Sequence, residues 1–422
     1  MLLLLLLLLL RRRLLNLDLE FNATETIARS GCPLTAAMLT FSHTFVREIA
    51  PKVYAAYCTL ARDSYCPFGL FETSCAIDTD QERATVRASF EAAERYSLAS
   101  IDHHQLRLIS GAALASNSIL KFPLKMTSPL NGLQRSDCIF PVQAITIPGS
   151  PITHASAGDV FAPYPVSRGQ CSFIPTTNGV AVGSTEAEAT IRATMELLER
   201  DAIMRFWYLG DEQKNYKIPE RYISETASSY FQFLADLGYS TLGFEISVFE
   251  GAFVVLLFAL HRSLQYPALA CSAGASPDFP AAVRAACAEL VQTLAALSLQ
   301  PARFSAWIEK GRVLSHLDHH MFYYADSTNA AVAAPLLLER WKNAPISNGL
   351  ENERQTTPIF QHLAEQKVEI FAANITPPQV KGEIAAIRIL SPQLFPLVVG
   401  ETSGPQELLA SPSRVKLPHP FP

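Results

Sequence analysis

Two stretches of the sequence that favour long amphipathic helices, residues 79–100 and 184–208, carry the same charged pattern, Glu-x-x-Glu-Arg. The charged residues of the two patterns are Glu91, Glu94, Arg95, Glu196, Glu199 and Arg200. Spacings of three and four residues place each set on one face of its helix. On an exposed helix, such a set would only add ion pairs worth about 0.2–0.5 kcal/mol each. Because both sets lie among apolar neighbours, the charged face of each helix is narrow and could point into a cleft.

A third predicted helix, residues 279–298, presents Glu289 and Gln292 at a spacing of three. Three helices that each offer paired oxygen atoms suit a hard cation such as Mg²⁺, which takes oxygen ligands and bridges phosphate oxygens. The sequence contains no GxxxxGK(S/T) phosphate-binding loop. If a nucleotide binds, carboxylate-held Mg²⁺ must therefore anchor it, and Arg95 and Arg200 could offset the charge of its phosphates directly.

The remaining pattern predicts an α+β fold with mixed or antiparallel sheets covered by helices. Predicted strands occupy residues 240–249, 252–261, 367–376 and 383–390. The first two of these runs predict a hairpin, whereas residues 34–62 have helical spacing. Residues 127–178 are rich in Pro, Gly, Ser and Thr, which indicates long loops at a lobe boundary. Thr79 or Asp80 is expected to cap the first charged helix and Ser184 the second.

Composition and charge exclude several classes of protein. The chain of 422 residues is 49% hydrophobic and 17% charged, which is typical of a globular protein with two lobes or with large insertions. A net charge of −5 argues against nucleic acid as the main partner. The eight cysteines form no CxxC pair and have no regular spacing, so neither a zinc knuckle nor a disulfide framework is indicated. Reduced thiols fit a cytoplasmic protein best.

The N-terminal run of nine leucines precedes Arg11, Arg12 and Arg13. A secretory signal carries its positive charge before the apolar run, and no small-residue cleavage site follows here. The run also falls well short of the ~20 residues that a helix needs to cross a bilayer. We therefore expect a short helical extension, or residues translated from an upstream start site, and no membrane partner.

The C-terminal sequence KLPHPFP has proline at every second position, at Pro418, Pro420 and Pro422. Proline fixes φ and has no N–H to donate, so the segment is stiff and extended and can enter neither a helix nor a central strand. It could be a disordered tail. Alternatively, it is a rod that delivers the terminal carboxylate to a fixed place.

Several motifs in order resemble those of the YcaO family. Residues 173–207, with a TNGxAxG turn followed by a helix that ends in ExxERDA, resemble the central signature of the family. Residues 80–96 resemble its first ExxERY helix, and residues 274–292 resemble its GxSP turn and RAxxExxQ helix. Residues 318–326 are similar to its DHxxxY block, and the alternating prolines at 418–422 are similar to the PxPxP end of its azoline-forming branch.

The resemblance implies an ATP-dependent cyclodehydratase of thiazole/oxazole-modified peptide biosynthesis, a class that includes bacteriocin pathways. In that reaction a Cys, Ser or Thr side chain of a ribosomal precursor peptide attacks the preceding amide, and ATP phosphorylates the resulting oxyanion. The resemblance implies a YcaO-like fold, with residues 1–75 as an N-terminal extension that contacts a partner and residues 76–422 as the catalytic domain with its PxPxP tail.

The resemblance also assigns roles to individual residues. Metal ligands are expected to be Glu91, Glu94, Glu196, Glu199 and Glu289. Contacts to ATP are expected from Glu91, Glu94, Arg95, Asn178, Glu196, Glu199, Arg200, Gln292 and Arg388. Arg200 and the carboxylate of Pro422 are the expected catalytic groups. In a purely structural interpretation, Gly179 and Gly183 only form the turn and Asp201 only pairs with Arg200.

Two departures from the family pattern affect the nucleotide contacts and the partners. No Gly-Lys-Gly element precedes the first charged helix, and position 87 is Arg where many members have Ser. No fused ubiquitin-activating-like domain is recognisable, so we expect a separate subunit of that type to bind the leader of the precursor peptide. Whether an FMN-dependent dehydrogenase is a further partner stays open at this point.

Three other interpretations compete with azoline formation. A YcaO enzyme could instead form thioamides or macroamidines. A non-catalytic YcaO scaffold subunit could only dock the precursor and its partner, although such a subunit has no physical need for paired acids. A metal-dependent hydrolase would need the clustered histidines, but His316, His319 and His320 form no HExxH pattern and are expected to be surface or packing residues.

Overall fold

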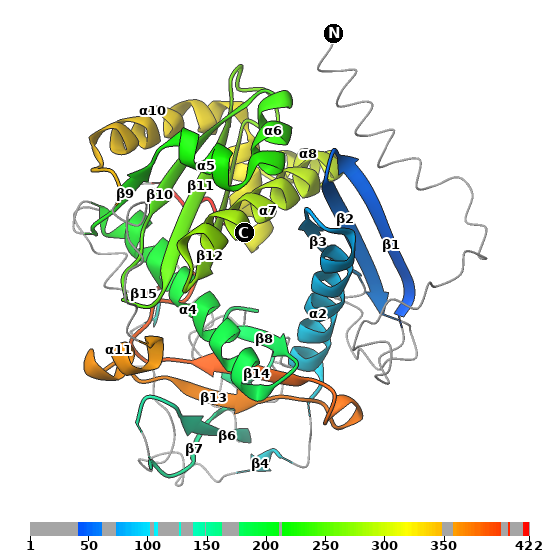
Figure 1. The fold of residues 1–422 in the computed structure, drawn as a ribbon, viewed down its shortest axis with the longest axis vertical. Coiled ribbons are helices and arrows are strands. Elements are labelled where there is room, and N and C mark those ends of the chain that lie inside the picture. Colours follow the sequence, from blue (N-terminus) through cyan, green and yellow to red (C-terminus); the bar gives the residue numbers. More distant parts are fainter. Residues whose placement is uncertain are drawn as a thin grey trace.

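The computed structural model describes most of the chain between residue 41 and residue 421. The described residues are 41–60, 73–101, 105–108, 126–127, 138–147, 149–162, 177–210, 213–347, 358–397, 404–405 and 417–421. The leucine-rich N-terminus, much of the predicted loop region and Pro422 therefore lie outside the described residues. The predicted α+β fold is confirmed, with antiparallel sheets covered by helices (Figure 1).

A four-stranded antiparallel sheet has the order β12-β11-β10-β9. Its strands are β9 (Tyr216–Ile218), β10 (Tyr239–Glu245), β11 (Phe253–His261) and β12 (Leu269–Ser276). The predicted hairpin is confirmed, because β10 and β11 pair from Tyr239↔His261 onward and Gly251 has a φ of 82° in the turn. β11 is buried on both faces, which explains its uninterrupted apolar run.

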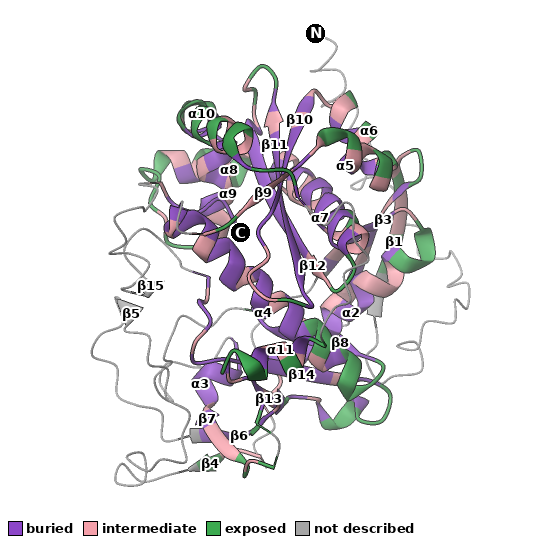
Figure 2. Ribbon diagram, turned by 60° about the vertical axis from the view of Figure 1, so that its left-hand side comes forward, coloured by how far each residue is buried: buried purple, intermediate pink, exposed green. Residues whose placement is uncertain are grey.

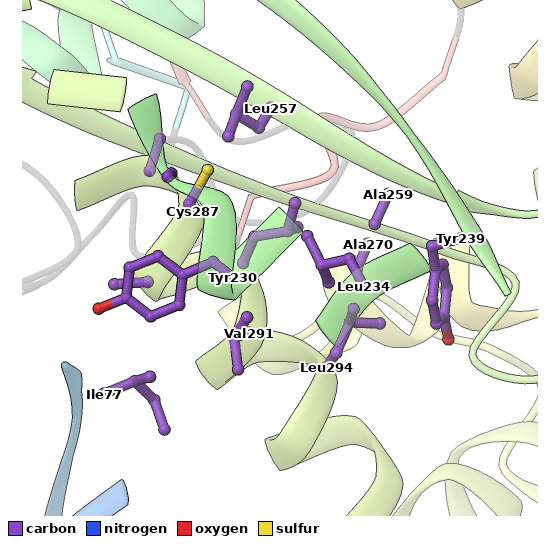
Figure 3. Packing of buried hydrophobic residues seen from close by; sticks show 14 of the residues in the cluster. Ile77, Tyr230, Leu234, Tyr239, Leu257, Ala259, Ala270, Cys287, Val291 and Leu294 are labelled. Atoms are coloured by element: carbon purple, nitrogen blue, oxygen red, sulfur yellow. The ribbon is translucent and has the colours of Figure 1, made fainter. Parts of the chain in front are cut away.

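Helices cover both faces of this sheet. The first face packs against α5 (Glu220–Thr226), α6 (Ser228–Asp236) and α7 (Phe279–Leu299), and Figure 3 shows this core between β11, β12, α6 and α7. The second face packs against α4 (Glu186–Tyr208), α9 (Leu317–Ala325) and α10 (Ser327–Asn343). Leu257 of β11 lies in the first core, and its neighbours Leu256 and Phe258 lie in the second.

A second sheet has the strand order β4-β6-β13-β14-β8, with β7 also paired to β6. Its strands are β4 (Arg107–Leu108), β6 (Cys138–Ala144), β7 (Thr153–Ser156), β8 (Val180–Gly183), β13 (Phe371–Asn374) and β14 (Ala385–Leu390). The predicted strands at 367–376 and 383–390 are thus confirmed as an antiparallel pair with the register Ala373↔Arg388. The shorter elements are α3 (Ala157–Val160), α8 (Pro301–Glu309), α11 (Ile359–Glu365), η6 (Pro378–Val380), β5 (Met126–Thr127) and β15 (Gly404–Pro405).

The helix predicted over residues 34–62 is wrong where the structure describes it. β1 (Phe41–Ala50) and β2 (Val53–Leu60) form a hairpin, and β3 (Thr73–Asp78) completes a three-stranded sheet that packs on α2 (Gln81–Ala99). Pro51 interrupts any helix, and Lys52 takes a φ of 59° in the turn. Val, Tyr and Thr in this segment favour strands, and this preference outweighs the apparent helical spacing.

The capping predictions have mixed outcomes. Asp80 caps α2 as predicted, because its carboxylate accepts a hydrogen bond of 2.9 Å from the N–H of Arg83. Ser184 is not the cap of α4, since the Thr185 hydroxyl accepts from the N–H of Glu188. Both patterns satisfy donors that a helix N-terminus leaves unpaired.

The sheets place α2, α4 and α7 around the centre of the molecule (Figure 1), and residues 417–419 pack against α4 and α9. α4 contacts β8 and β14 of one sheet and β11 and β12 of the other, and it is buried along much of its length (Figure 2). Among the described helices, α7 has the length and apolar composition of a membrane span. It packs tightly on β12, as the core helix of a folded protein does.

The close approach of α7 to β12 requires a glycine at position 274. A Cβ atom there would lie 2.5 Å from both the carbonyl oxygen of Ala282 and the nitrogen of Ala286. We expect Gly274→Ala to lower the free energy of unfolding by about 3 kcal/mol, because the helix backbone must move away. Urea unfolding measures this change. Gly311→Ala is the control, since its φ of 81° costs only about 1 kcal/mol where no atom is near. Equal losses in both variants would contradict the packing argument.

Candidate active site

The charged patterns of α2, α4 and α7 converge. The side chains that influence one another electrostatically are Glu94, Glu196, Glu199, Arg200 and Glu289. We call these five residues the carboxylate cluster. The sequence-based expectation that the three helices present their acids to one site therefore agrees with their placement, and their roles stay predictions.

Glu94 connects α2 to the second sheet. Its Oε1 accepts a hydrogen bond of 3.1 Å from the N–H of Val182 in β8, and Nη2 of Arg192 lies 3.8 Å away. Burial raises the pKa of Glu94 to about 8, and the nearby Glu196 adds to this rise while Arg192 opposes it. Glu91 is more exposed and accepts a hydrogen bond of 3.1 Å from Nε of Arg95.

Arg200 lies among the acids of the cluster. Its Nη1 is 3.1 Å from Oε1 of Glu199, and its Nη2 is 3.5 Å from Oε1 of Glu196. Burial lowers the pKa of the guanidinium, but Glu199, Glu196 and Glu289 together outweigh this effect and raise it. Arg200 therefore stays charged.

Burial shifts the pKa values of the other acids of the cluster in the same direction. Burial raises the pKa of Glu199, whose side chain is only 6% exposed, although Arg200 opposes the rise. Burial also raises the pKa of Glu289 to about 8, and the charge of Glu199 adds to this. Gln292 is partly buried one turn further along α7.

The cluster holds more acidic groups than cations, and this imbalance fits Mg²⁺. A divalent cation would supply the positive charge that keeps these buried carboxylates ionised. Within the described residues, no three His, Cys, Asp or Glu side chains are grouped closely enough to hold a metal ion alone. Proteins usually bind Mg²⁺ through one or two carboxylates together with water and substrate phosphates, and the cluster offers carboxylates for such a site.

The turn before β8 lies beside the cluster. Gly179 has a φ of 72°, and a Cβ atom there would be 2.9 Å from the carbonyl oxygen of Ile389. Its own carbonyl accepts a hydrogen bond of 2.7 Å from the N–H of Ile389 in β14. Glycine is therefore needed for both the turn and the close approach. The turn holds the buried Asn178 next to the strand that carries Arg388.

The C-terminal segment, residues 417–421, packs into the protein. The indole Nε1 of Trp207 donates a hydrogen bond of 2.9 Å to the carbonyl of Leu417, and the Tyr324 hydroxyl donates to the carbonyl of Pro418. The ring of His320 stacks on that of His419 with centroids 4.1 Å apart, and its Nδ1 lies 2.8 Å from the His419 carbonyl oxygen. The DHxxxY block of the sequence thus holds this segment.

The clustered histidines were expected to be surface or packing residues. This agrees with the structure, because His320 is buried in packing and His316 is exposed. The guanidinium carbon of Arg200 lies 4.3 Å from the ring centroid of Phe421. The C-terminal segment therefore reaches the carboxylate cluster, as a rod would and as a disordered tail would not. The predicted catalytic carboxylate of Pro422 itself lies outside the described residues.

Comparison with known families accounts for this combination of features. A family model described as YcaO cyclodehydratase, ATP- and Mg²⁺-binding, matches residues 78–395. The chain belongs to the YcaO family. Its expected cofactors, ATP and Mg²⁺, are those in the description of the family. No curated protein matches the sequence.

Solved structures share the fold at low identity. A YcaO protein from Methanopyrus kandleri, bound with AMPPCP and Mg²⁺, has a TM-score of 0.57 and 15% identity over 84% of this chain and 86% of its own. A heterocyclase in complex with substrate and cofactor has a TM-score of 0.65 and 14% identity over 90% of this chain and 55% of its own. A chain of the E. coli microcin synthetase McbBCD complex has a TM-score of 0.59 and 12% identity over 91% of this chain and 100% of its own.

Sequence analysis did not assign two residues of this site, Asp159 and Arg87. Asp159 of α3 is buried and faces Arg388, whose pKa burial lowers to about 10 while Glu196 and Asp159 oppose the change. Arg87 donates to the carbonyl of Ile77 and also acts on Glu289. A single Asp in a loop-like stretch gives no signal of its role. Arg87 was noticed only as a departure from the family pattern.

Asp201 and Gly183 both have structural roles, but the partner of Asp201 differs from the expected one. Asp201 does not pair with Arg200, because its carboxylate accepts a hydrogen bond of 2.7 Å from Nε of Arg205 and another of 2.8 Å from the N–H of Phe395. Gly183 allows the start of α4 to approach the strand, since a Cβ atom there would be 2.7 Å from the nitrogen of Ala189.

The raised pKa values predict how pH affects the stability of the Mg²⁺-free protein. Glu94 and Glu289 have pKa values of about 8 in the folded state, against 4.5 as the ordinary value. Between these values the folded state binds more protons than the unfolded state, so these groups lower the free energy of unfolding as the pH rises from about 5 to about 8. Denaturant unfolding across this range should give a flatter profile for Glu94→Gln and Glu289→Gln than for the wild type.

The control for this prediction is Glu225→Gln, which removes an exposed acid from an i,i+4 pair with Arg221. Its profile should match that of the wild type. Identical profiles for all three variants and the wild type would show that the acids of the cluster are ionised before Mg²⁺ binds.

Proposed function

We propose that the chain is an ATP-dependent cyclodehydratase that converts Cys, Ser or Thr residues of a ribosomal precursor peptide to thiazolines or oxazolines. The observation that carries this proposal is the contact between Arg200 and Phe421. It brings the alternating-proline segment, typical of the azoline-forming branch, to the carboxylates that fit Mg²⁺. Membership of the YcaO family and the fold shared with a heterocyclase support the same function.

The chemistry explains why such a site suffices. The peptide side chain adds to the preceding amide carbon, and the amide oxygen must then leave, which it does poorly unless it is phosphorylated. ATP bound with Mg²⁺ supplies the phosphoryl group, so that phosphate and ADP are the products along with the C=N bond of the ring. The protein positions the peptide and neutralises charge, and Arg200 is placed to offset the negative charge on the phosphates.

The competing functions explain less of the structure. Thioamide or macroamidine formation would use the same nucleotide site but gives no reason for a proline-rich segment packed against Arg200. A non-catalytic scaffold gives no reason for burying several acids whose pKa values rise because of that burial, since each adds a desolvation cost.

Partners and location complete the proposal. We propose a separate ubiquitin-activating-like subunit that binds the leader of the precursor peptide, and the likeness of this chain to one chain of the McbBCD complex supports a multi-subunit assembly. An FMN-dependent dehydrogenase that oxidises the azolines is a compatible further partner, and a cytoplasmic location fits the free thiols of Cys58, Cys75, Cys271 and Cys287.

The proposed role of Glu199 leads to a direct test. Glu199→Gln keeps the shape of the side chain but removes the charge opposite the metal, so ATP consumption with partner and precursor should fall by roughly two orders of magnitude. Circular dichroism should show that the variant remains folded, because Gln keeps the size of the side chain and avoids the cost of burying a carboxylate whose pKa is raised by that burial. Glu225→Gln is the matched control. Unchanged ATP consumption in the Glu199 variant would contradict the proposed role of Glu199 as a ligand of the metal.

The proposed role of the Pro422 carboxylate leads to a second test. A short Gly-Ser extension after Pro422 should abolish ring formation, measured as the loss of one water mass per ring, because it moves the carboxylate away from the reacting amide. Binding of ATP should persist, since Phe421 is unchanged. The same extension placed before Met1 is the control. Ring formation at the rate of the wild-type chain would show that the C-terminal segment only packs against the protein and that its carboxylate has no catalytic role.

A further inference from the structure

Four contacts hold the C-terminal segment, three through its main chain and one through a side chain. Trp207, Tyr324 and His320 meet main-chain carbonyls of residues 417–419, which suits a segment whose prolines have no N–H to offer. Phe421 is different, because its side chain is buried against the guanidinium of Arg200. The segment is therefore anchored by its first residues and meets the carboxylate cluster through its aromatic ring.

The hydrogen bonds of Arg200 leave its orientation underdetermined. Within the described residues, its buried Nε has no hydrogen-bond partner, and its Nη1 is in ion-pair contact with Glu199 at 3.1 Å without the alignment of a good hydrogen bond. Its Nη2 contact to Glu196 is long, at 3.5 Å. Buried N–H groups without acceptors cost about 1–3 kcal/mol each, so this guanidinium is arranged for an anionic acceptor that is not part of the chain.

The aromatic ring supplies the missing constraint. A guanidinium that stacks on a ring has its plane fixed, while the N–H groups at its edge stay available for bidentate bonds to phosphate oxygens. Without the ring, Arg200 could turn further toward Glu199 and Glu196, whose Oε1 atoms already lie 3.1 and 3.5 Å from it, and close its N–H edge onto them.

We propose that Phe421 is a positioning residue for Arg200, so that docking of the C-terminal segment and binding of Mg²⁺-ATP stabilise each other. The inference rests on the proposed function and adds that the segment belongs to the nucleotide site as well as to the peptide site. Because such coupling is reciprocal, nucleotide must tighten the docking of the segment by the same factor by which the docked segment tightens nucleotide binding.

The first test measures the dissociation constant of Mg²⁺-ATP on the full chain without precursor peptide. Phe421→Leu keeps apolar volume but removes the π face, and should weaken binding about tenfold. Phe421→Tyr keeps the face and should stay within about twofold of the wild type. A merely structural role would lower the thermal midpoint in both variants alike and would not separate them by affinity.

A matched control is available on the same helix. Arg205 stacks on Phe395 at 4.7 Å but is paired with Asp201, outside the carboxylate cluster. Phe395→Leu should therefore leave the dissociation constant of Mg²⁺-ATP unchanged. Equal affinities of wild type and Phe421→Leu, or equal weakening by Phe395→Leu, would overturn the inference.

The second test measures the reciprocal effect. Hydrogen exchange of the C-terminal peptide in the wild-type chain should slow when Mg²⁺ and a non-hydrolysable ATP analogue are added, and this slowing should be lost in Phe421→Leu at the same nucleotide saturation. Exchange that nucleotide does not change would overturn the coupling. A wild-type chain that binds no Mg²⁺-ATP would instead overturn the proposed function itself, so the two failures are distinguishable.

Discussion

Burial of several carboxylates around one guanidinium is the constraint on which the rest of the site depends. Glu196, Glu199 and Glu289 act on Arg200, Glu94 of α2 acts together with Glu196, and burial raises the pKa values of these acids. Such an arrangement costs folding free energy, so the surrounding packing must be strong enough to bear it. The continuous cores on both faces of β11 provide that packing. In the proposed function, Mg²⁺ bound with ATP supplies the positive charge that the acids lack.

Much of this arrangement could be predicted from local sequence. The spacing of Glu and Arg predicted that two acids and one arginine share a face on each of α2 and α4, because helical periodicity is a local property. The hairpin of β10 and β11 and the pair of β13 and β14 were recognisable from their β-branched and aromatic runs. The segment of β1 and β2 was not, since its helical spacing competed with the strand preference of its residues, and Pro51 was the signal that should have decided.

Contacts between distant parts of the chain could not be predicted in the same way. Asp159 of α3 acts on Arg388 of β14 only through the tertiary structure, and no periodic pattern links the two residues. The same holds for Tyr324 and Pro418, which are 94 positions apart. The proline spacing showed that the C-terminal segment is stiff, whereas its binding site on α4 and α9 is a property of the tertiary structure.

α4 has a mechanical consequence for access to the site. Its first turns belong to the core below β14, and its last turns belong to the core of the other sheet, with Glu199 and Arg200 between them. A helix of 23 residues is about 35 Å long and resists bending. The two sheets therefore cannot rotate away from each other without breaking α4, the helix that carries Glu199 and Arg200. Under the proposed function, Glu199 and Arg200 therefore keep one arrangement relative to both sheets from one turnover to the next.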